Sequence, residues 1–205
     1  MKDESLKTID ILLERGGTLN PTNYKMYQNQ TVDYLCYTNL FYTQCSIQRP
    51  LFVEHLEDEI TINITSGVET CFQNLKSELE AKGYTVNLGP MQIKTQLLTG
   101  RANIEVDRKI DLTKNEETKS LNKINTVVSS PIYNLAIMAQ EIAKQEAKFC
   151  YAAYNGIMIF YPSFDIEKKS IGSGENASKI YIIGDRGSGK KLNIAIRSCA
   201  LPAGL

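Results

Sequence analysis

The spacing of apolar residues changes several times along this chain, and these changes limit the folds it can adopt. Apolar residues recur at the helical period in residues 3–15, 50–83 and 132–154, whereas residues 84–128 alternate apolar and polar side chains between turn signals. We expect the first helix to end at Gly16-Gly17 and the second at Gly83. The pattern predicts an α+β fold in which an antiparallel β-meander packs against two or three amphipathic helices.

Local features predict where these elements bend or stop. The β-branched run in residues 60–65 favours strand over helix, so we expect a kink near Gly67 or a short strand within the second helix. Gly156 is expected to stop the third helix. Three further strands are predicted at residues 157–160, 180–183 and 192–197.

Size and charge narrow the classes of partner. A chain of 205 residues can bury a self-sufficient core, so residues 1–205 are predicted to form a single domain. The 23 basic residues balance the 23 acidic residues, which predicts no nucleic-acid partner and no attraction to an anionic membrane. No apolar run approaches the ~20 residues of a membrane helix, and the chain opens at Met1 with a polar helix instead of a signal peptide.

Residues 18–49 lose the helical period and are rich in Tyr, Asn, Gln and Thr, which predicts a loop or a hairpin. Their tyrosines have two interpretations, because aromatic side chains either pack in a core or form a binding surface. The candidates for such a surface are Tyr24, Tyr27, Tyr34, Tyr37 and Tyr42.

The five cysteines show no CxxC spacing and have no neighbouring histidine, which disfavours a zinc site or a thioredoxin-like pair. Cys36 and Cys45 lie nine residues apart, and a disulfide between them would stabilise the fold by roughly 2–3 kcal/mol in an oxidising compartment. Buried free thiols are the alternative. A bridge between Cys71 and Cys150, each on a predicted helix, is the next expectation, and it leaves Cys199 unpaired or partnered elsewhere.

Three sequons are candidates for N-glycosylation if the chain is exported: Asn29, Asn63 and Asn176. Asn176 lies in a Gly/Ser-rich stretch that is typical of an exposed loop, whereas Asn63 falls within a helical pattern. We therefore expect Asn176 to be the preferred acceptor.

The segment Gly184-Asp-Arg-Gly-Ser-Gly-Lys190 matches a phosphate-binding loop up to its lysine. Such a loop needs Ser or Thr next to hold magnesium, and it must open a helix. Here Lys191 follows, and the residues after it alternate like a strand. A β-hairpin with a glycine-rich turn explains the same residues, and it is the interpretation we favour.

His55 is the one histidine, and it stands among Glu54, Glu57, Asp58 and Glu59. A catalytic base or a metal ligand is one interpretation, and a solvated helix face is the other. Because there is no second histidine for a two-histidine metal site, we expect the solvated face.

The order of these parts resembles a family of uncharacterised archaeal surface proteins with a pilin-like N-terminal export signal. In that family a helix ending in Gly-Gly precedes an aromatic-rich segment, a long helix with a cysteine before an aromatic, a strand meander and a second helix. The matching parts are Arg15-Gly-Gly17, residues 24–42, Glu54 to Gly83 with Cys71-Phe72, residues 84–128, and Ile132 to Glu146. The resemblance implies an export signal and a hydrophobic helix that precede Lys2.

These features predict a non-enzymatic protein of the cell surface, structural or adhesive, anchored through an N-terminal hydrophobic helix. Its expected partners are other surface or pilus proteins, or itself, and no cofactor, metal or catalytic residue is predicted. The alternative is a small soluble nucleotide- or phosphate-binding protein that uses Arg186, Lys190 and Lys191 of the Gly184–Lys191 loop.

Overall fold

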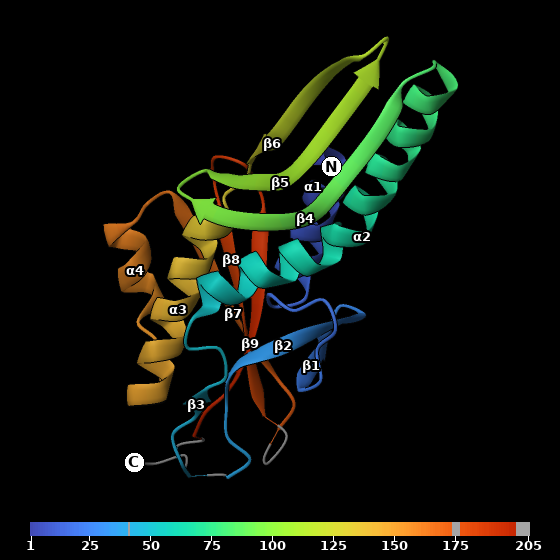
Figure 1. The fold of residues 1–205 in the computed structure, drawn as a ribbon. Helices are drawn as coiled ribbons and strands as arrows, with labels where there is room; N and C mark the ends of the chain where they lie inside the picture. The colour runs from blue at the N-terminus through green and yellow to red at the C-terminus, as the bar shows by residue number, and fades with distance from the viewer. Residues whose placement is uncertain (41, 174–176, 200–205) are drawn as a thin grey trace.

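The computed structural model describes residues 1–40, 42–173 and 177–199, and this part of the chain contains four helices and nine strands (Figure 1). The α+β class predicted from the sequence is confirmed. Within the described residues, no helix combines the length and the apolar composition needed to cross a membrane. The helices are α1 (Lys2–Glu14), α2 (Phe52–Ala81), α3 (Ile132–Phe149) and α4 (Tyr154–Phe160).

The larger sheet contains strands from both the N-terminal and the C-terminal part of the described chain. Its strands are β1 (Tyr24–Tyr27), β2 (Gln30–Tyr37), β3 (Ser46–Ile47), β7 (Phe164–Ile171), β8 (Ser178–Asp185) and β9 (Lys191–Arg197). The order is β1-β2-β9-β8-β7, with β3 also paired to β2. The β2–β9 pair is parallel and the other pairs are antiparallel. The β1–β2 and β8–β9 hairpins confirm the predictions for residues 18–49 and for the glycine-rich segment.

The smaller sheet is the predicted antiparallel meander. It consists of β4 (Thr85–Leu98), β5 (Arg101–Lys114) and β6 (Glu117–Ser129), in that order. Figure 1 shows that the meander extends away from the larger sheet, with α2 lying along it. Alternate residues of β4 and β5 are buried or partly buried, whereas most of β6 is exposed, so one face of the meander packs against the core and the other meets solvent.

The core forms where α2 meets the meander, α1 and α3. α2 buries an apolar residue at every fourth position, which keeps these side chains near one helix face: Phe52, Leu56, Ile60, Ile64, Val68 and Phe72. A second, smaller cluster lies on the opposite face of the larger sheet, since alternate strand residues point to opposite sides: Val32, Tyr34, Ile180, Ile182 and Ala195.

A buried arginine connects α2 to the meander. Arg108 of β5 is 7% exposed, and its Nη1 and Nη2 donate to the two carboxylate oxygens of Glu69 on α2 at 2.7 and 3.2 Å. Its guanidinium also lies 4.9 Å from the ring centroid of Phe72. The bidentate pair and the cation–π contact together fix the register of helix against sheet.

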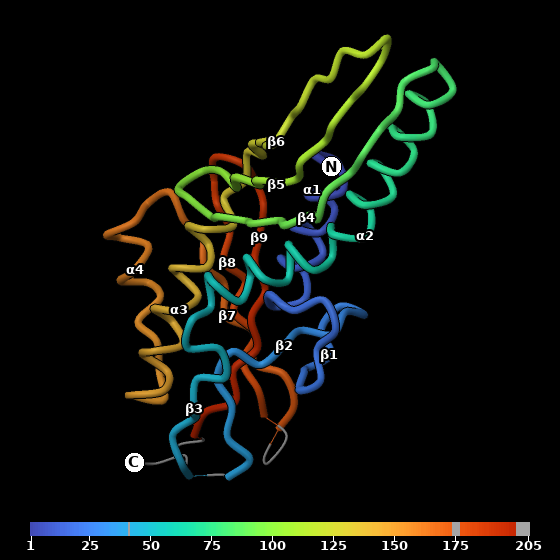
Figure 2. The backbone as a smooth tube through the Cα atoms, viewed as in Figure 1, coloured from blue at the N-terminus to red at the C-terminus, as the bar shows by residue number. Residues whose placement is uncertain are grey.

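Three local expectations about the helices were wrong: a short strand within residues 60–65, a strand at residues 157–160, and the end of the third helix at Gly156. The β-branched run in residues 60–65 forms no strand, because burial of Ile60 and Ile64 keeps it helical; Figure 2 shows α2 as one continuous, curved helix. Residues 157–160 belong to α4 instead of a strand. The third helix ends at Phe149, where Cys150 adopts a left-handed φ of 56°, so Gly156 lies inside the next helix.

Candidate functional site

The glycine-rich turn between β8 and β9 is held by hydrogen bonds among its own residues. Asp185 Oδ2 accepts hydrogen bonds from Ser188 N at 2.8 Å and Ser188 Oγ at 2.6 Å, and Asp185 N donates to Lys190 O at 2.9 Å. A phosphate would need the Ser188 amide, which already donates to this carboxylate. The chain then continues into β9 and not into a helix, so the geometry lacks the helix N-terminus of a phosphate-binding loop.

Two of the three basic residues of the Gly184–Lys191 loop, Arg186 and Lys190, are paired with carboxylates. Lys190 Nζ donates to both carboxylate oxygens of Asp10 on α1, at 2.7 and 2.8 Å. Arg186 lies 3.6 Å from a carboxylate oxygen of Asp165 on β7. The charge needed to attract a polyphosphate is therefore largely balanced at this position.

A groove of about 540 Å³ lies between α1, the β1–β2 turn and strands β7–β9. We call it the α1–sheet groove. It is predominantly polar, with one aromatic ring among charged and amide side chains, and it includes Asp10, Glu14, Tyr27, Gln28, Glu167, Lys169, Ile182, Lys190, Lys191 and Asn193. Residues from both ends of the chain thus meet in one concave surface.

The β1–β2 turn supplies one wall of this groove. Tyr27 pairs with Gln30, so the hairpin loop has only two residues, Gln28 and Asn29. Their φ values are 46° and 68°, the left-handed conformations that a two-residue hairpin loop of the primed type requires. This tight turn places Tyr27 and Gln28 at the groove and leaves Asn29 exposed at its tip.

Ion pairs and hydrogen bonds tie the groove's charged walls together. Lys169 lies 3.0 Å from Glu167, and this hydrogen bond holds the pKa of the Glu167 carboxyl below its usual range. Asn193 Nδ2 donates to Glu14 O at 3.3 Å, which joins β9 to α1. Because charges of both signs alternate around it, the groove favours a neutral, polar ligand over a highly charged one.

The five candidate tyrosines do not form one surface. Tyr34 is 6% exposed, and its hydroxyl lies 2.7 Å from Ser178 Oγ, so it belongs to the core. Tyr37 is half-buried, with its ring centroid 4.9 Å from that of Tyr34. Tyr27 contributes to the α1–sheet groove. Of the five, only Tyr24 and Tyr42 are largely exposed, at 46% and 69%.

Two disulfides are present, and they differ in part from the expected pairing. Cys36 and Cys45 are joined, with Cα atoms 5.4 Å apart, as the local pairing predicted. Cys150 is joined to Cys199, with Cα atoms 5.6 Å apart. The predicted Cys71–Cys150 bridge was wrong, because Cys71 lies on the exposed side of α2, next to the buried stripe. Two disulfides suggest an oxidising, extracellular setting.

Peptide mapping under non-reducing conditions tests this connectivity directly. We expect it to recover the pairs Cys36–Cys45 and Cys150–Cys199, and we expect an alkylating reagent to label Cys71 without prior reduction, because this thiol is exposed. A digest of reduced protein provides the unlinked masses for comparison. Recovery of Cys71 in any intramolecular disulfide would contradict the structure.

The three sequons fall in different environments. Asn29 is exposed in the β1–β2 turn. Asn63 lies within α2, and its Nδ2, the atom that would carry a glycan, donates to Thr8 Oγ1 at 2.8 Å. Asn176, the acceptor favoured by the sequence, lies outside the described residues. Asn29 is therefore the described sequon whose side chain is open to modification.

His55 belongs to a polar cluster near the end of α1, where its side chain is 22% exposed, so the predicted solvated position is only partly correct. Thr18 Oγ1 lies 3.0 Å from Asp33 Oδ2 and 3.0 Å from His55 Nε2. Burial raises the pKa of the Asp33 carboxyl, opposed by Arg49 at 3.4 Å, and burial lowers the pKa of His55, opposed by Glu59. His55 and Asp33 both contact one hydroxyl, so the acid–histidine–hydroxyl order of a nucleophilic triad is absent from the described hydrogen bonds.

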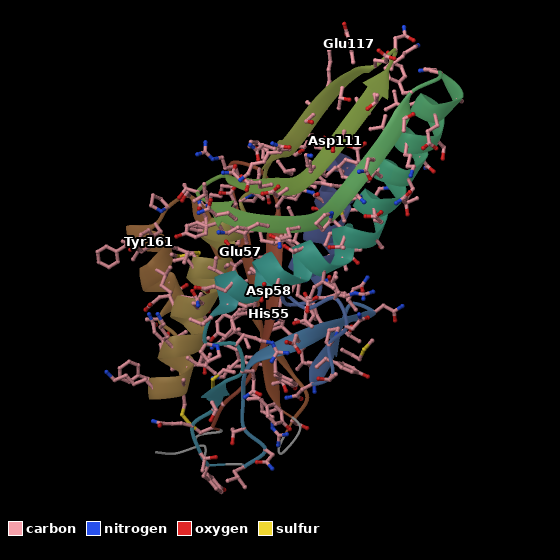
Figure 3. All side chains as sticks on the ribbon, viewed as in Figure 1. His55, Glu57, Asp58, Asp111, Glu117 and Tyr161 are labelled. Carbon is pink, nitrogen blue, oxygen red and sulfur yellow. A yellow bond between two sulfur atoms is a disulfide. The ribbon has the colours of Figure 1, made fainter. Side chains whose placement is uncertain are left out.

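Two of the acidic residues around His55, Glu57 and Glu59, accept hydrogen bonds from the backbone of neighbouring segments. Glu57 Oε1 accepts from Leu97 N of β4 at 2.7 Å, and Glu59 Oε2 accepts from Leu19 N at 2.9 Å. Figure 3 labels His55, Glu57 and Asp58 on α2. These carboxylates satisfy backbone amides of neighbouring segments, and no cluster able to hold a metal ion occurs in the described residues.

Sequence reasoning missed a buried carboxylate at the C-terminal end of α3. Glu146 is fully buried, and it accepts from Tyr181 Oη at 2.5 Å, Lys179 Nζ at 2.6 Å and Ser198 Oγ at 2.7 Å. Burial and the bond to Glu146 raise the pKa of Tyr181. A glutamate on the apolar stripe of α3 was the available signal, since unpaired carboxylates are almost never buried.

Comparison with known proteins adds no assignment to this geometry. No protein-family model, no curated protein and no solved structure matches the chain.

Proposed function

We propose that the chain is the extracellular domain of a non-enzymatic cell-surface protein, structural or adhesive, anchored through a hydrophobic N-terminal segment. The two disulfides carry this proposal, because such bonds form and persist in oxidising compartments. The order of elements that resembles pilin-like archaeal surface proteins, and the exposed sequon at Asn29, support the same setting. Other surface proteins, or further copies of the chain, are the proposed partners.

The α1–sheet groove supplies the adhesive site of this proposal. Its ligand is a neutral, hydroxyl-rich molecule such as a surface carbohydrate. The ring of Tyr27 offers an apolar face, while Gln28, Asn193 and the nearby carboxylates offer donors and acceptors for hydroxyl groups. Lys169 is paired with Glu167 and Lys190 with Asp10, so their charges are already balanced and a polyanion is disfavoured in this groove.

Binding of neutral oligosaccharides to the immobilised chain tests this site. The variant Tyr27→Ala is expected to weaken binding about tenfold, a loss of about 1.4 kcal/mol, because the ring is removed from the groove. Tyr24→Ala is the matched control, since Tyr24 lies on the same strand outside the groove lining and is expected to bind like the parent.

Two outcomes would contradict the adhesive site. Binding that is unchanged in Tyr27→Ala, or equally weakened in Tyr24→Ala, would place the ligand elsewhere. A melting temperature measured on both variants separates loss of the site from loss of the fold, because Tyr27 also packs against the smaller apolar cluster.

A further inference from the structure

The helical hairpin of α3 and α4 has an unusual concentration of exposed apolar side chains. Figure 1 places the two helices side by side at one edge of the molecule, and Figure 3 shows the labelled Tyr161 directed outward there. We call this surface the α3–α4 face. Its exposed large apolar residues are Ile137, Phe149, Tyr151, Ile159, Phe160 and Tyr161. Exposed apolar side chains that are concentrated in one part of a soluble protein mark a site of association.

The shape of this face combines a ridge and a groove. Ile159 and Phe160 are 78% and 81% exposed and project from α4. Phe160 also forms one wall of a groove of about 590 Å³ between α3 and α4, whose lining includes Ile137, Ile157 and Gly156. A ridge next to a groove on one surface is self-complementary, because a two-fold axis can seat the ridge of each copy in the groove of the other.

The charges at the groove are also self-complementary. Glu141 and Lys144 both line it, three residues apart on α3. In the part of the chain that the structure describes, Lys144 makes no salt bridge. An antiparallel approach of two α3 helices would bring Glu141 of each copy beside Lys144 of the other. The zero net charge of the chain adds no long-range repulsion between copies.

The exposed area fits a dimer. The six apolar side chains together expose on the order of 700 Å² per copy, if each offers about 200 Å² when fully exposed. Two copies would then remove about 1,400 Å² from water, which falls within the 1,200–2,000 Å² typical of specific, stable interfaces. The size of the surface is thus consistent with a second copy of similar extent.

We propose that the chain forms a two-fold homodimer through the α3–α4 face, with Phe160 of each copy in the groove of the other. This inference goes beyond the adhesive site and does not depend on it. The α1–sheet groove is lined by α1, the β1–β2 turn and strands β7–β9, and no residue of its lining belongs to α3 or α4. Dimerisation would therefore present two adhesive grooves on one particle, which raises avidity.

Sedimentation velocity of the disulfide-bonded chain at micromolar to submillimolar concentration tests the dimer. The parent is expected to sediment as a dimer, and Phe160→Glu as a monomer, because a charge would enter an apolar groove. Ile62→Glu is the matched control: Ile62 is 74% exposed on α2, so this variant is expected to remain dimeric. A monomeric parent, or a dimeric Phe160→Glu, would overturn the proposal.

A second variant, chosen to leave the fold intact, fills the groove between α3 and α4 from within. A Cβ added at Gly156 meets no atom within 4 Å, so the side chain of Gly156→Leu would begin in open space at the groove lining. We expect this variant to be monomeric with a melting temperature no lower than that of the parent, since glycine is unfavourable within a helix. A Gly156→Leu protein that still dimerises would overturn the proposed seat of Phe160.

Charge exchange tests the two-fold arrangement itself. Glu141→Lys and Lys144→Glu are each expected to weaken dimerisation at least tenfold, because like charges would then face each other across the axis. An equimolar mixture of the two variants is expected to recover the dimer, since every cross-pair becomes attractive. Failure of the mixture to associate would overturn the antiparallel α3 contact.

A lipid surface is the alternative occupant of an exposed aromatic face, and it is distinguished by vesicle flotation. Vesicles of equal parts phosphatidylcholine and phosphatidylglycerol are the probe. We expect the parent chain to stay unbound, because its net charge is zero and its apolar face is covered in the dimer. Flotation of a monomeric parent with the vesicles, lost in Phe160→Glu, would replace the second copy with a membrane.

Discussion

Replacing Glu146 with alanine is expected to lower the free energy of unfolding by about 3–5 kcal/mol, as is typical when one partner of a buried ion pair is removed. The carboxylate is fully buried and accepts hydrogen bonds from Tyr181, Lys179 and Ser198. Without it, the buried Tyr181 hydroxyl loses its acceptor and the Lys179 ammonium loses its counter-charge. The contacts that hold α3 against β8 and the end of β9 are then unsatisfied.

Guanidinium unfolding of the disulfide-intact protein, followed by circular dichroism, measures this loss. Glu78→Ala is the control, an exposed glutamate on α2 outside the network and outside the α3–α4 face, and it is expected to change stability by less than about 0.5 kcal/mol. Tyr181→Phe removes one donor and leaves the ion pair, so an intermediate loss of about 1 kcal/mol is expected. A Glu146→Ala protein within 1 kcal/mol of the parent would show that the network contributes little.

Replacing Gly17 with alanine is expected to cost roughly 2–5 kcal/mol, for two reasons that add. Gly17 has a φ of 89°, which disfavours any residue with a Cβ by about 1–2 kcal/mol. The added Cβ would also lie 2.6 Å from Cζ of Phe52, a fully buried ring that begins the apolar stripe of α2. Overpacking of this kind typically costs a further 1–3 kcal/mol.

Gly83→Ala separates the two contributions. Gly83 has a similar φ of 80°, and a Cβ there would meet no atom within 4 Å. This variant is therefore expected to lose only the conformational part, about 1–2 kcal/mol. The difference between the two variants in the same denaturation experiment reports the clash with Phe52. Equal losses at both positions would mean that the Phe52 ring moves aside at little cost.

The parts of this fold that follow from local pattern were predictable. The helical period of residues 3–15 and 50–83 located α1 and α2, and strand alternation located the meander. The separation of nine residues made a Cys36–Cys45 bridge one of the two expected states, the other being free thiols, and the structure has the bridge. In each case the information lay within one segment, so neighbouring residues alone decided the outcome.

Predictions failed where distant segments decide the structure. The exposed position of Cys71 and the pairing of Cys150 with Cys199 depend on how α2 and α3 turn toward the core. α4 carries β-branched and aromatic residues that suggested a strand, but packing against α3 makes it helical. The α1–sheet groove collects side chains from residues 10 to 193, and no local motif marks it.

The parallel pairing of β2 with β9 has a consequence for the order in which the chain can fold. β2 ends at residue 37 and β9 begins at residue 191. The β2–β9 pair at the centre of the larger sheet therefore cannot form until more than 150 further residues have been synthesised. The segment from α2 to β6 is contiguous and can form early, whereas the β1–β2 hairpin stays without its neighbour. In an exported chain, the last strand to emerge would therefore be the one that completes the fold.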